Sequence, residues 1–228
     1  MTTRRERRRA ERYQEIVDAA MALVLSDGLS HLTIARLARS CDAAVGAIYR
    51  YFPGKADVIA ALQLRAVAQL RHYFDQARRD AEPTCAAQPP AEAALRRLLV
   101  APRAWAGFAA EHPALYSLAD RSLSVPERLL NDAQAAAVDE AIKPILAAVV
   151  GLFDDAVAVG ALSPGDAALR AHALWAALHG AGHFRKRDGR VHASLRAAEI
   201  QGALVSGLML GWGASPSHLS AAQEAARR

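Results

Sequence analysis

Alanine occupies 54 of the 228 positions, and this feature limits the possible folds more than any other. Alanine has the highest intrinsic helix propensity, whereas strands favour β-branched and aromatic residues. Aromatic side chains make up only 6% of the chain, although hydrophobic residues reach 53% and suffice for a packed core. The composition therefore predicts an all-α fold and argues against an all-β sandwich or barrel.

Cysteine content and hydropathy indicate the compartment. The two cysteines, Cys41 and Cys85, are too few for a disulfide framework or a four-cysteine zinc site, as expected in a reducing interior. No apolar run reaches the roughly 20 residues that span a bilayer. Acidic residues at 11, 15 and 18 interrupt the place where the apolar core of an export signal would lie. We expect a cytoplasmic protein with no membrane partner.

The N-terminus is strongly basic. Residues 1–12 hold six arginines against two glutamates, a local charge of +4. Such a run is typical of a solvated tail, and it also suits an arm that contacts phosphate or enters a minor groove. Residues 13–27 then carry apolar side chains at helical spacing, which predicts a first helix that ends at Gly28.

Two short helices follow at close spacing. The first is predicted over 33–40 with Thr33 as its N-cap, and the second over 44–52, where Pro53 stops it. Asp42 lies in the turn between them, a position that tolerates left-handed backbone geometry. A long helix is predicted over 55–79. Two short helices joined by such a turn behind a basic segment form a helix-turn-helix pattern.

The second half is also predicted to be helical. The segment 82–91 contains three prolines and is expected to be a loop between two functional halves. Two long helices are predicted over 164–187 and 194–213, the first with Ser163 as its cap and Pro164 at its first position. The alanine-rich segment after residue 213 is expected to fray.

The helix-turn-helix segment also resembles a known family. The residues from Thr33 to Lys55, TIARLARSCDAAVGAIYRYFPGK, strongly resemble the DNA-binding half of the tetracycline-repressor (TetR) family of bacterial transcriptional regulators. The most specific part is VGAIYRYFPGK at 45–55. The resemblance covers roughly residues 10–70, whereas the C-terminal half resembles the family only in its helical layout and in LWAALHG at 174–180.

The resemblance implies a division into three parts. These are a basic arm at 1–12, a three-helix DNA-binding domain at 13–70 with its motif at 33–52, and a helical effector-binding and dimerisation domain at 71–228. The expected partners are double-stranded operator DNA, a small-molecule effector of unknown identity and a second copy of the chain. Dimerisation is expected through the last two long helices, about 164–187 and 194–213, with burial inside one chain as the alternative.

The chemistry of the second short helix suits DNA. Its first residues are small, so its N-terminus can approach base edges and phosphates in a major groove. Tyrosine hydroxyls and the ammonium group of Lys55 suit phosphate contacts. Tyr49 packed in the core and Arg36 as a solvent-facing charge are the alternatives. The predicted DNA-binding residues are Thr33, Arg36, Ala44, Val45, Gly46, Ala47, Tyr49, Arg50, Tyr51 and Lys55.

The motif departs from the family pattern at two positions. Asp42 stands where the family usually has glycine, and Ala43 stands where a larger apolar residue is usual. The second helix also lacks an asparagine or glutamine that would grip a base with two hydrogen bonds. Sequence readout is therefore expected from Arg50, from methyl contacts by Val45 and Ala47, or from DNA shape.

Aromatic and histidine side chains in the second half are candidates for an effector pocket, with ordinary core packing as the alternative for each. His172, His179 and His183 share one helical face, but no acidic or cysteine ligands accompany them, so no metal or other cofactor is predicted. The predicted ligand-binding residues are Trp105, Phe108, Tyr116, Phe153, Trp175, His179 and His183.

These patterns together predict a homodimeric transcriptional regulator, a repressor released from a palindromic operator by its effector. The long helix from residue 55 is the expected lever between the two halves. The sequence contains no signature motif of an enzyme, so no catalytic residue is predicted. The alternatives are a helical small-molecule binding protein without operator function, a nucleoid-type protein that binds DNA without sequence preference, and a small all-α enzyme.

Overall fold

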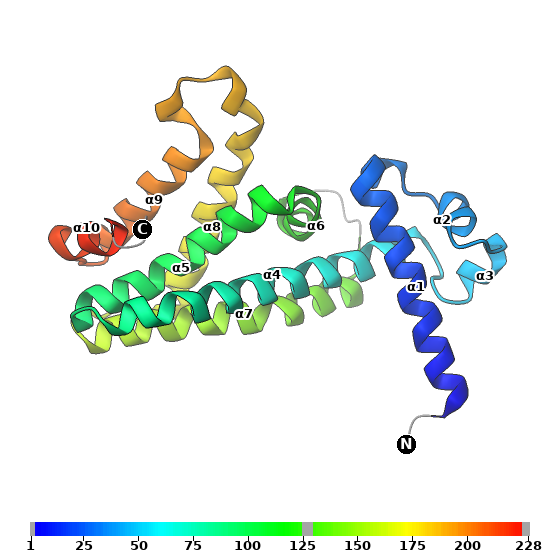
Figure 1. Cartoon of the computed structure of the whole chain (residues 1–228), viewed down its shortest axis with the longest axis horizontal. Helices are drawn as coiled ribbons and strands as arrows, with labels where there is room; N and C mark the ends of the chain where they lie inside the picture. Colours follow the sequence, from blue (N-terminus) through cyan, green and yellow to red (C-terminus); the bar gives the residue numbers. More distant parts are fainter. Residues whose placement is uncertain (1–2, 125–129, 225–228) are drawn as a thin grey trace. The chain divides into compact units, whose positions relative to one another are not determined.

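The computed structural model describes residues 3–124 and 130–224, and every regular element in those ranges is a helix (Figure 1). The prediction of an all-α fold is confirmed. The elements are α1 (Arg4–Asp27), the 3₁₀ helix η1 (Leu29–His31), α2 (Ile34–Ser40), α3 (Val45–Tyr49), α4 (Lys55–Ala86), α5 (Pro90–Glu111), α6 (Pro113–Ser124), α7 (Asp132–Ala158), α8 (Ala167–His183), the 3₁₀ helices η2 (Phe184–Arg190) and η3 (Ala193–Leu195), α9 (Ala197–Gly211) and α10 (Pro216–Glu224).

The chain divides into two compact groups of residues. The first unit comprises Met1–Gln69 and His112–Ala141, and the second unit comprises Leu70–Glu111 and Ile142–Arg228. Both α4 and α7 contribute residues to each unit. Residues 112–141 thus belong with the first unit, although the sequence analysis placed them in the second half; the functional domain boundaries at 12 and 70 stay predictions.

The basic N-terminal segment is helical rather than an irregular arm. Helix α1 begins at Arg4, nine residues before the predicted start, and residues 1–2 lie outside the described ranges. A capping box starts it: the Thr3 hydroxyl accepts from the Glu6 N–H at 3.2 Å, and the Glu6 carboxylate accepts from the Thr3 N–H at 2.7 Å. The predicted boundary was wrong because a Thr-x-x-Glu cap outweighs the repulsion between neighbouring arginines.

The predicted loop at 82–91 is mostly helix. Helix α4 continues to Ala86 with Pro83 inside it, and α5 starts at Pro90. Tertiary contacts stabilise the last turn of α4, since Cys85 is fully buried and Glu82 pairs with Arg97 of α5. Proline disfavours a helix interior, but burial and an ion pair outweigh that local preference here.

Three predictions about the C-terminal helices were also wrong in detail. Helix α8 starts at Ala167, where the Asp166 carboxylate accepts from the Leu169 N–H at 2.9 Å, so Asp166 is the cap rather than Ser163. It ends at His183 and continues as 3₁₀ structure, and α9 is shorter than predicted at both ends. The expected frayed tail contains α10, which buries Leu219; residues 225–228 lie outside the described ranges.

Helix length and apolarity bear on membrane insertion. Within residues 3–124 and 130–224, no helix is both long and apolar enough to cross a bilayer.

Candidate functional site

Helices α2 and α3 meet through a tight turn, as the sequence predicts. Thr33 caps α2, its hydroxyl accepting from the Arg36 N–H at 3.2 Å. Asp42 takes a φ of +48°, the left-handed conformation that reverses the chain between the two helices. The Ala43 N–H then donates to the Ala38 carbonyl at 2.9 Å and closes the turn. Helix α3 spans only five residues, shorter than the predicted 44–52, because Arg50–Phe52 form turns.

The inner side of the motif is an apolar core. Leu37 and Ile48 are completely buried, and Phe52 is nearly so. The ring of Tyr13 from α1 stacks on Phe52 with centroids 4.9 Å apart. These contacts fix the orientation of α3 against α1, so that its other side faces outward.

The outward side carries most of the predicted DNA-binding residues. Ala44, Val45 and Gly46 at the start of α3 are exposed, Val45 with 42% of its surface. Tyr49 is 50% exposed, so it is not a core residue, and Arg50 is exposed beside it. A β-carbon added at Gly46 would meet nothing within 4 Å. The N-terminal end of α3 is therefore slim and accessible.

Tyr51 and Lys55 lie at the start of α4. Lys55 is exposed as the first residue of α4. Tyr51 is half-buried and, with Tyr13 and Asp57, lines an open cavity of about 460 Å³. The Asp57 carboxylate holds this corner together, since its oxygens accept from the Gly54 N–H and from Gln134 of α7, both at 2.7 Å.

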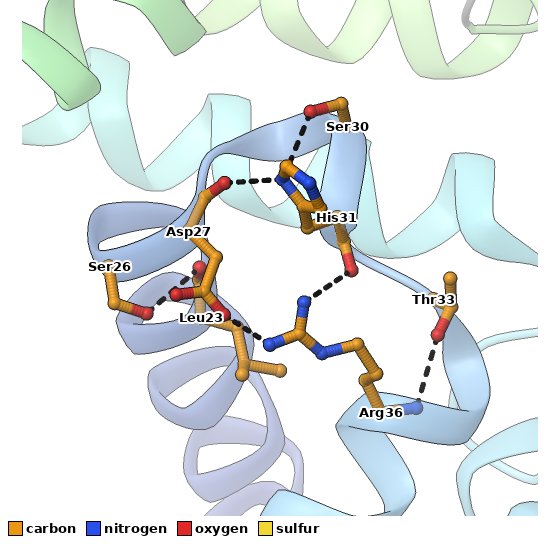
Figure 2. A network of polar contacts seen from close by, with 7 residues as sticks. All are labelled: Leu23, Ser26, Asp27, Ser30, His31, Thr33 and Arg36. Atoms are coloured by element: carbon orange, nitrogen blue, oxygen red, sulfur yellow. Dashed lines mark hydrogen bonds and ion pairs between the residues drawn. The ribbon is translucent and has the colours of Figure 1, made fainter.

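Arg36 is held within the first unit. Its guanidinium pairs with the Asp27 carboxylate at the end of α1 and donates to the His31 carbonyl at 3.3 Å, as Figure 2 shows. Hydrogen bonds from Arg36 and Ser26 lower the pKa of Asp27. The position of Arg36 thus ties α2 to α1 and differs from that of the exposed residues on α3.

The sequence analysis missed one arginine of the motif. Arg12 of α1 donates to the Cys41 carbonyl at 3.1 Å, directly before the turn residue Asp42, and it pairs with Glu15 at 2.7 Å. It was assigned to the basic arm, so its contact with the turn was not foreseen. Its three-residue spacing from Glu15 was the available signal for a structured position.

The predicted ligand-binding residues do not form a single group. In the second unit, the His179 ring lies 4.4 Å from the Trp105 ring and 5.3 Å from the Trp175 ring, between centroids. Phe108 instead contacts Tyr73, and Phe153 contacts Trp212. His183 is exposed, and Tyr116 belongs to the first unit. In the part of the chain that the structure describes, no three His, Cys, Asp or Glu side chains are grouped as a metal site.

Two family models match the chain. Residues 16–62 match the bacterial regulatory proteins of the tetR family, and residues 98–205 match the tetracyclin repressor-like C-terminal domain. This chain belongs to the TetR family. The prediction from the segment at 33–55 is confirmed, and the second model extends the assignment over the C-terminal half.

Among curated relatives, the nucleoid occlusion factor SlmA of Actinobacillus pleuropneumoniae is 36% identical over 70 residues, or 30% of this chain. The match spans only 35% of that relative, about a third of its length.

Solved structures share the fold at lower identity. RolR with its ligand resorcinol superposes with a TM-score of 0.62 at 16% identity, over 97% of this chain and 96% of that one. AibR in complex with isovaleryl coenzyme A and operator DNA superposes with a TM-score of 0.56 at 16% identity, over 87% and 98%. Identity this low supports the fold alone.

Proposed function

We propose that this TetR-family protein is a homodimeric repressor that leaves a palindromic operator when a small molecule binds its C-terminal half. The exposed N-terminal end of α3, projecting from a packed helix-turn-helix core, is the observation that carries this proposal. A helix end with small side chains and free N–H groups suits the major groove of duplex DNA.

Each exposed residue has a chemical role at that interface. Val45 and Ala47 offer methyl groups to thymine, while Ala44 and Gly46 allow close approach. Arg50 is the candidate for base or phosphate contact, and the remaining residues bind phosphate through hydroxyl groups and the Lys55 ammonium. Arg36 instead positions α2 through Asp27, because its guanidinium already has partners in the first unit. The phosphate-binding residues are Thr33, Tyr49, Tyr51 and Lys55.

The outer faces of α8 and α9 support dimerisation. Leu169 on α8 is 67% exposed, and Leu204 and Leu210 on α9 are about 40% exposed. Exposed glycines lie along the same faces, and a β-carbon added at Gly180 or Gly207 would meet nothing within 4 Å. Large apolar side chains beside glycines suit close helix packing, so we assign these faces to a four-helix contact with a second copy.

The second unit offers an aromatic site for the effector. Trp105, Trp175 and His179 provide flat apolar surfaces with polar ring nitrogens, the mixture typical of small-molecule sites. RolR and AibR, whose fold this chain shares, hold resorcinol and isovaleryl coenzyme A. Helix α4 contributes residues to both units and is the candidate lever. A tenfold loss of operator affinity needs an effector preference of about 1.4 kcal/mol for the released state.

Binding to DNA from the region flanking the protein's own gene tests the proposal. We expect a palindromic segment to bind at least about 100-fold more tightly than a scrambled duplex of equal length and composition, with affinity falling steeply as salt rises. Fluorescence anisotropy with both duplexes measures this ratio.

Equal affinity for palindromic and scrambled DNA would reject an operator-specific repressor. It would favour a nucleoid-type binder, a possibility that the SlmA match over the helix-turn-helix segment makes specific. The absence of binding to either duplex would favour the helical small-molecule binding protein.

A further inference from the structure

A cluster of arginines surrounds the junction of α4 and α5 in the second unit. Arg97 pairs with Glu82 through two hydrogen bonds of 2.5 and 3.0 Å. Arg96 precedes it, and Arg103 lies seven residues later, two turns along the same face of α5 as Arg96. The predicted loop at 82–91 concealed this cluster, because Glu82 and Cys85 were not expected to belong to a helix.

Arg96 is the unusual member. Only 9% of its surface is exposed, yet among the residues that the structure describes its guanidinium forms no hydrogen bond or ion pair. Arginine stays charged at any physiological pH, so it cannot relieve burial by losing a proton. A buried charge without a counter-charge is strongly unfavourable, which suggests that an anion completes this site.

The surroundings of Cys85 show that the charges converge. Burial raises the pKa of this thiol, while the positive charges of Arg96, Arg97 and Arg103 act in the opposite direction. All three guanidinium groups therefore lie within electrostatic reach of one buried atom at the end of α4. The three arginines and Glu82 sum to a formal charge of +2. Because Cys85 is fully buried and its pKa is raised, it is not a reactive thiol.

We propose that Arg96, Arg97 and Arg103 form a binding site for a phosphate group beside the last turn of α4. A phosphate dianion matches the net charge of the cluster, and guanidinium groups bind its oxygens with paired hydrogen bonds. The group belongs either to free inorganic phosphate or to a phosphorylated metabolite. The inference rests on the proposed function only where it makes this ligand the effector.

The thermal stability of the full-length protein without DNA tests the site. We expect about 10 mM inorganic phosphate to raise the Tm of the wild type by about 3 °C relative to sodium chloride of equal ionic strength. Arg96→Met should lose most of that rise, whereas Arg96→Lys keeps part of it. The matched control is Arg79→Met, which removes an exposed arginine from α4 and should respond like the wild type.

Without phosphate, Arg96→Met should unfold at or above the wild-type temperature, since it removes an unpaired buried charge. Equal phosphate responses in the wild type and Arg96→Met overturn the proposal. A wild type that responds neither to phosphate nor to adenosine monophosphate overturns it as well. If Arg96→Met does not fold, the Arg96→Lys response decides, and a response equal to that of the wild type in both size and affinity rejects a guanidinium site.

The two sources of phosphate separate in the same assay. A larger Tm shift with adenosine monophosphate than with inorganic phosphate indicates a phosphorylated metabolite, and equal shifts indicate the free ion. Operator affinity is measured separately with and without each probe. Anion binding without any effect on DNA supports the site but removes its role as effector site, while loss of operator binding alone concerns only the proposed function.

Discussion

The helix-turn-helix and the pair α8–α9 complete their folds in opposite ways. In the first, Leu37, Ile48 and Phe52 are buried within one chain, and the outward face presents mainly small or polar groups. In the second, large apolar side chains such as Leu169 and Leu210 stay exposed. The first region thus has a finished core and suits a polar, charged partner, whereas the second suits an apolar surface such as its own copy.

This difference gives the two surfaces different responses to salt. Phosphate contacts release counterions, so DNA binding at α3 weakens steeply as ionic strength rises. Burial of leucine and glycine faces on α8 and α9 depends on the hydrophobic effect and is insensitive to salt, or is strengthened by sulfate. The following experiments separate the two surfaces.

The largest effect is expected at Gly207. A tryptophan there fits the single chain, because nothing lies within 4 Å of an added β-carbon, but it blocks close approach of a second α9. Gly207→Trp should weaken dimerisation by at least about 100-fold, since overpacking a close helix contact costs several kcal/mol. Analytical ultracentrifugation measures the dimer fraction.

Gly189→Trp is the matched control for this substitution. Gly189 has equally open surroundings but lies in η2, outside the two helices. It should leave the dimer intact. A Gly207→Trp protein that sediments as a dimer with wild-type affinity would move the interface away from α9.

The next effect is expected at Val45. Glutamate at this exposed position brings a negative charge to the groove without touching the core, so Val45→Glu should weaken operator binding by about 30-fold and leave Tm within about 1 °C. Leu25→Glu, at a 54% exposed position on α1, is the control with the same charge in the same unit. If both variants lose affinity equally, the effect is general repulsion and α3 is not the reading helix.

The sequence predicted the helix-turn-helix well because local rules determine it. Thr33 caps α2, Asp42 supplies the left-handed turn and the spacing of Ile48 and Phe52 fixes the buried face. Each of these effects acts within a few residues, so a single sequence displays it. The exposure of Val45 followed from the same spacing.

The remaining errors share a physical cause. Pro83 indicated a loop, but burial of Cys85 and the ion pair of Glu82 with Arg97 keep α4 helical past it. Arg36 looked solvent-facing or DNA-facing until the fold placed Asp27 beside it. Such contacts join residues distant in sequence, and no local pattern announces them.

A smaller effect tests the turn itself. Asp42 holds a positive φ that glycine adopts without a steric penalty, so Asp42→Gly should stabilise the fold by up to about 1 kcal/mol, and Asp42→Ala should destabilise it by a similar amount. Urea unfolding followed by circular dichroism measures both. The order glycine, aspartate, alanine is expected; a glycine variant less stable than alanine would show that the side chain, rather than φ, decides.

The smallest effect is expected from acid at the junction between α1 and α2. Because Arg36 and Ser26 lower the pKa of Asp27 in the folded state, the charged carboxylate stabilises the fold above its ordinary pKa of about 3.9. That stabilisation is lost as the pH falls through the lowered value. Asp27→Asn should therefore melt below the wild type near pH 7, and the gap should close below about pH 4. In an Arg36→Gln background the gap should be small at every pH, because the main cause of the shift is gone; a gap of unchanged size there would assign the effect to Ser26 rather than to the ion pair that holds α2 on α1.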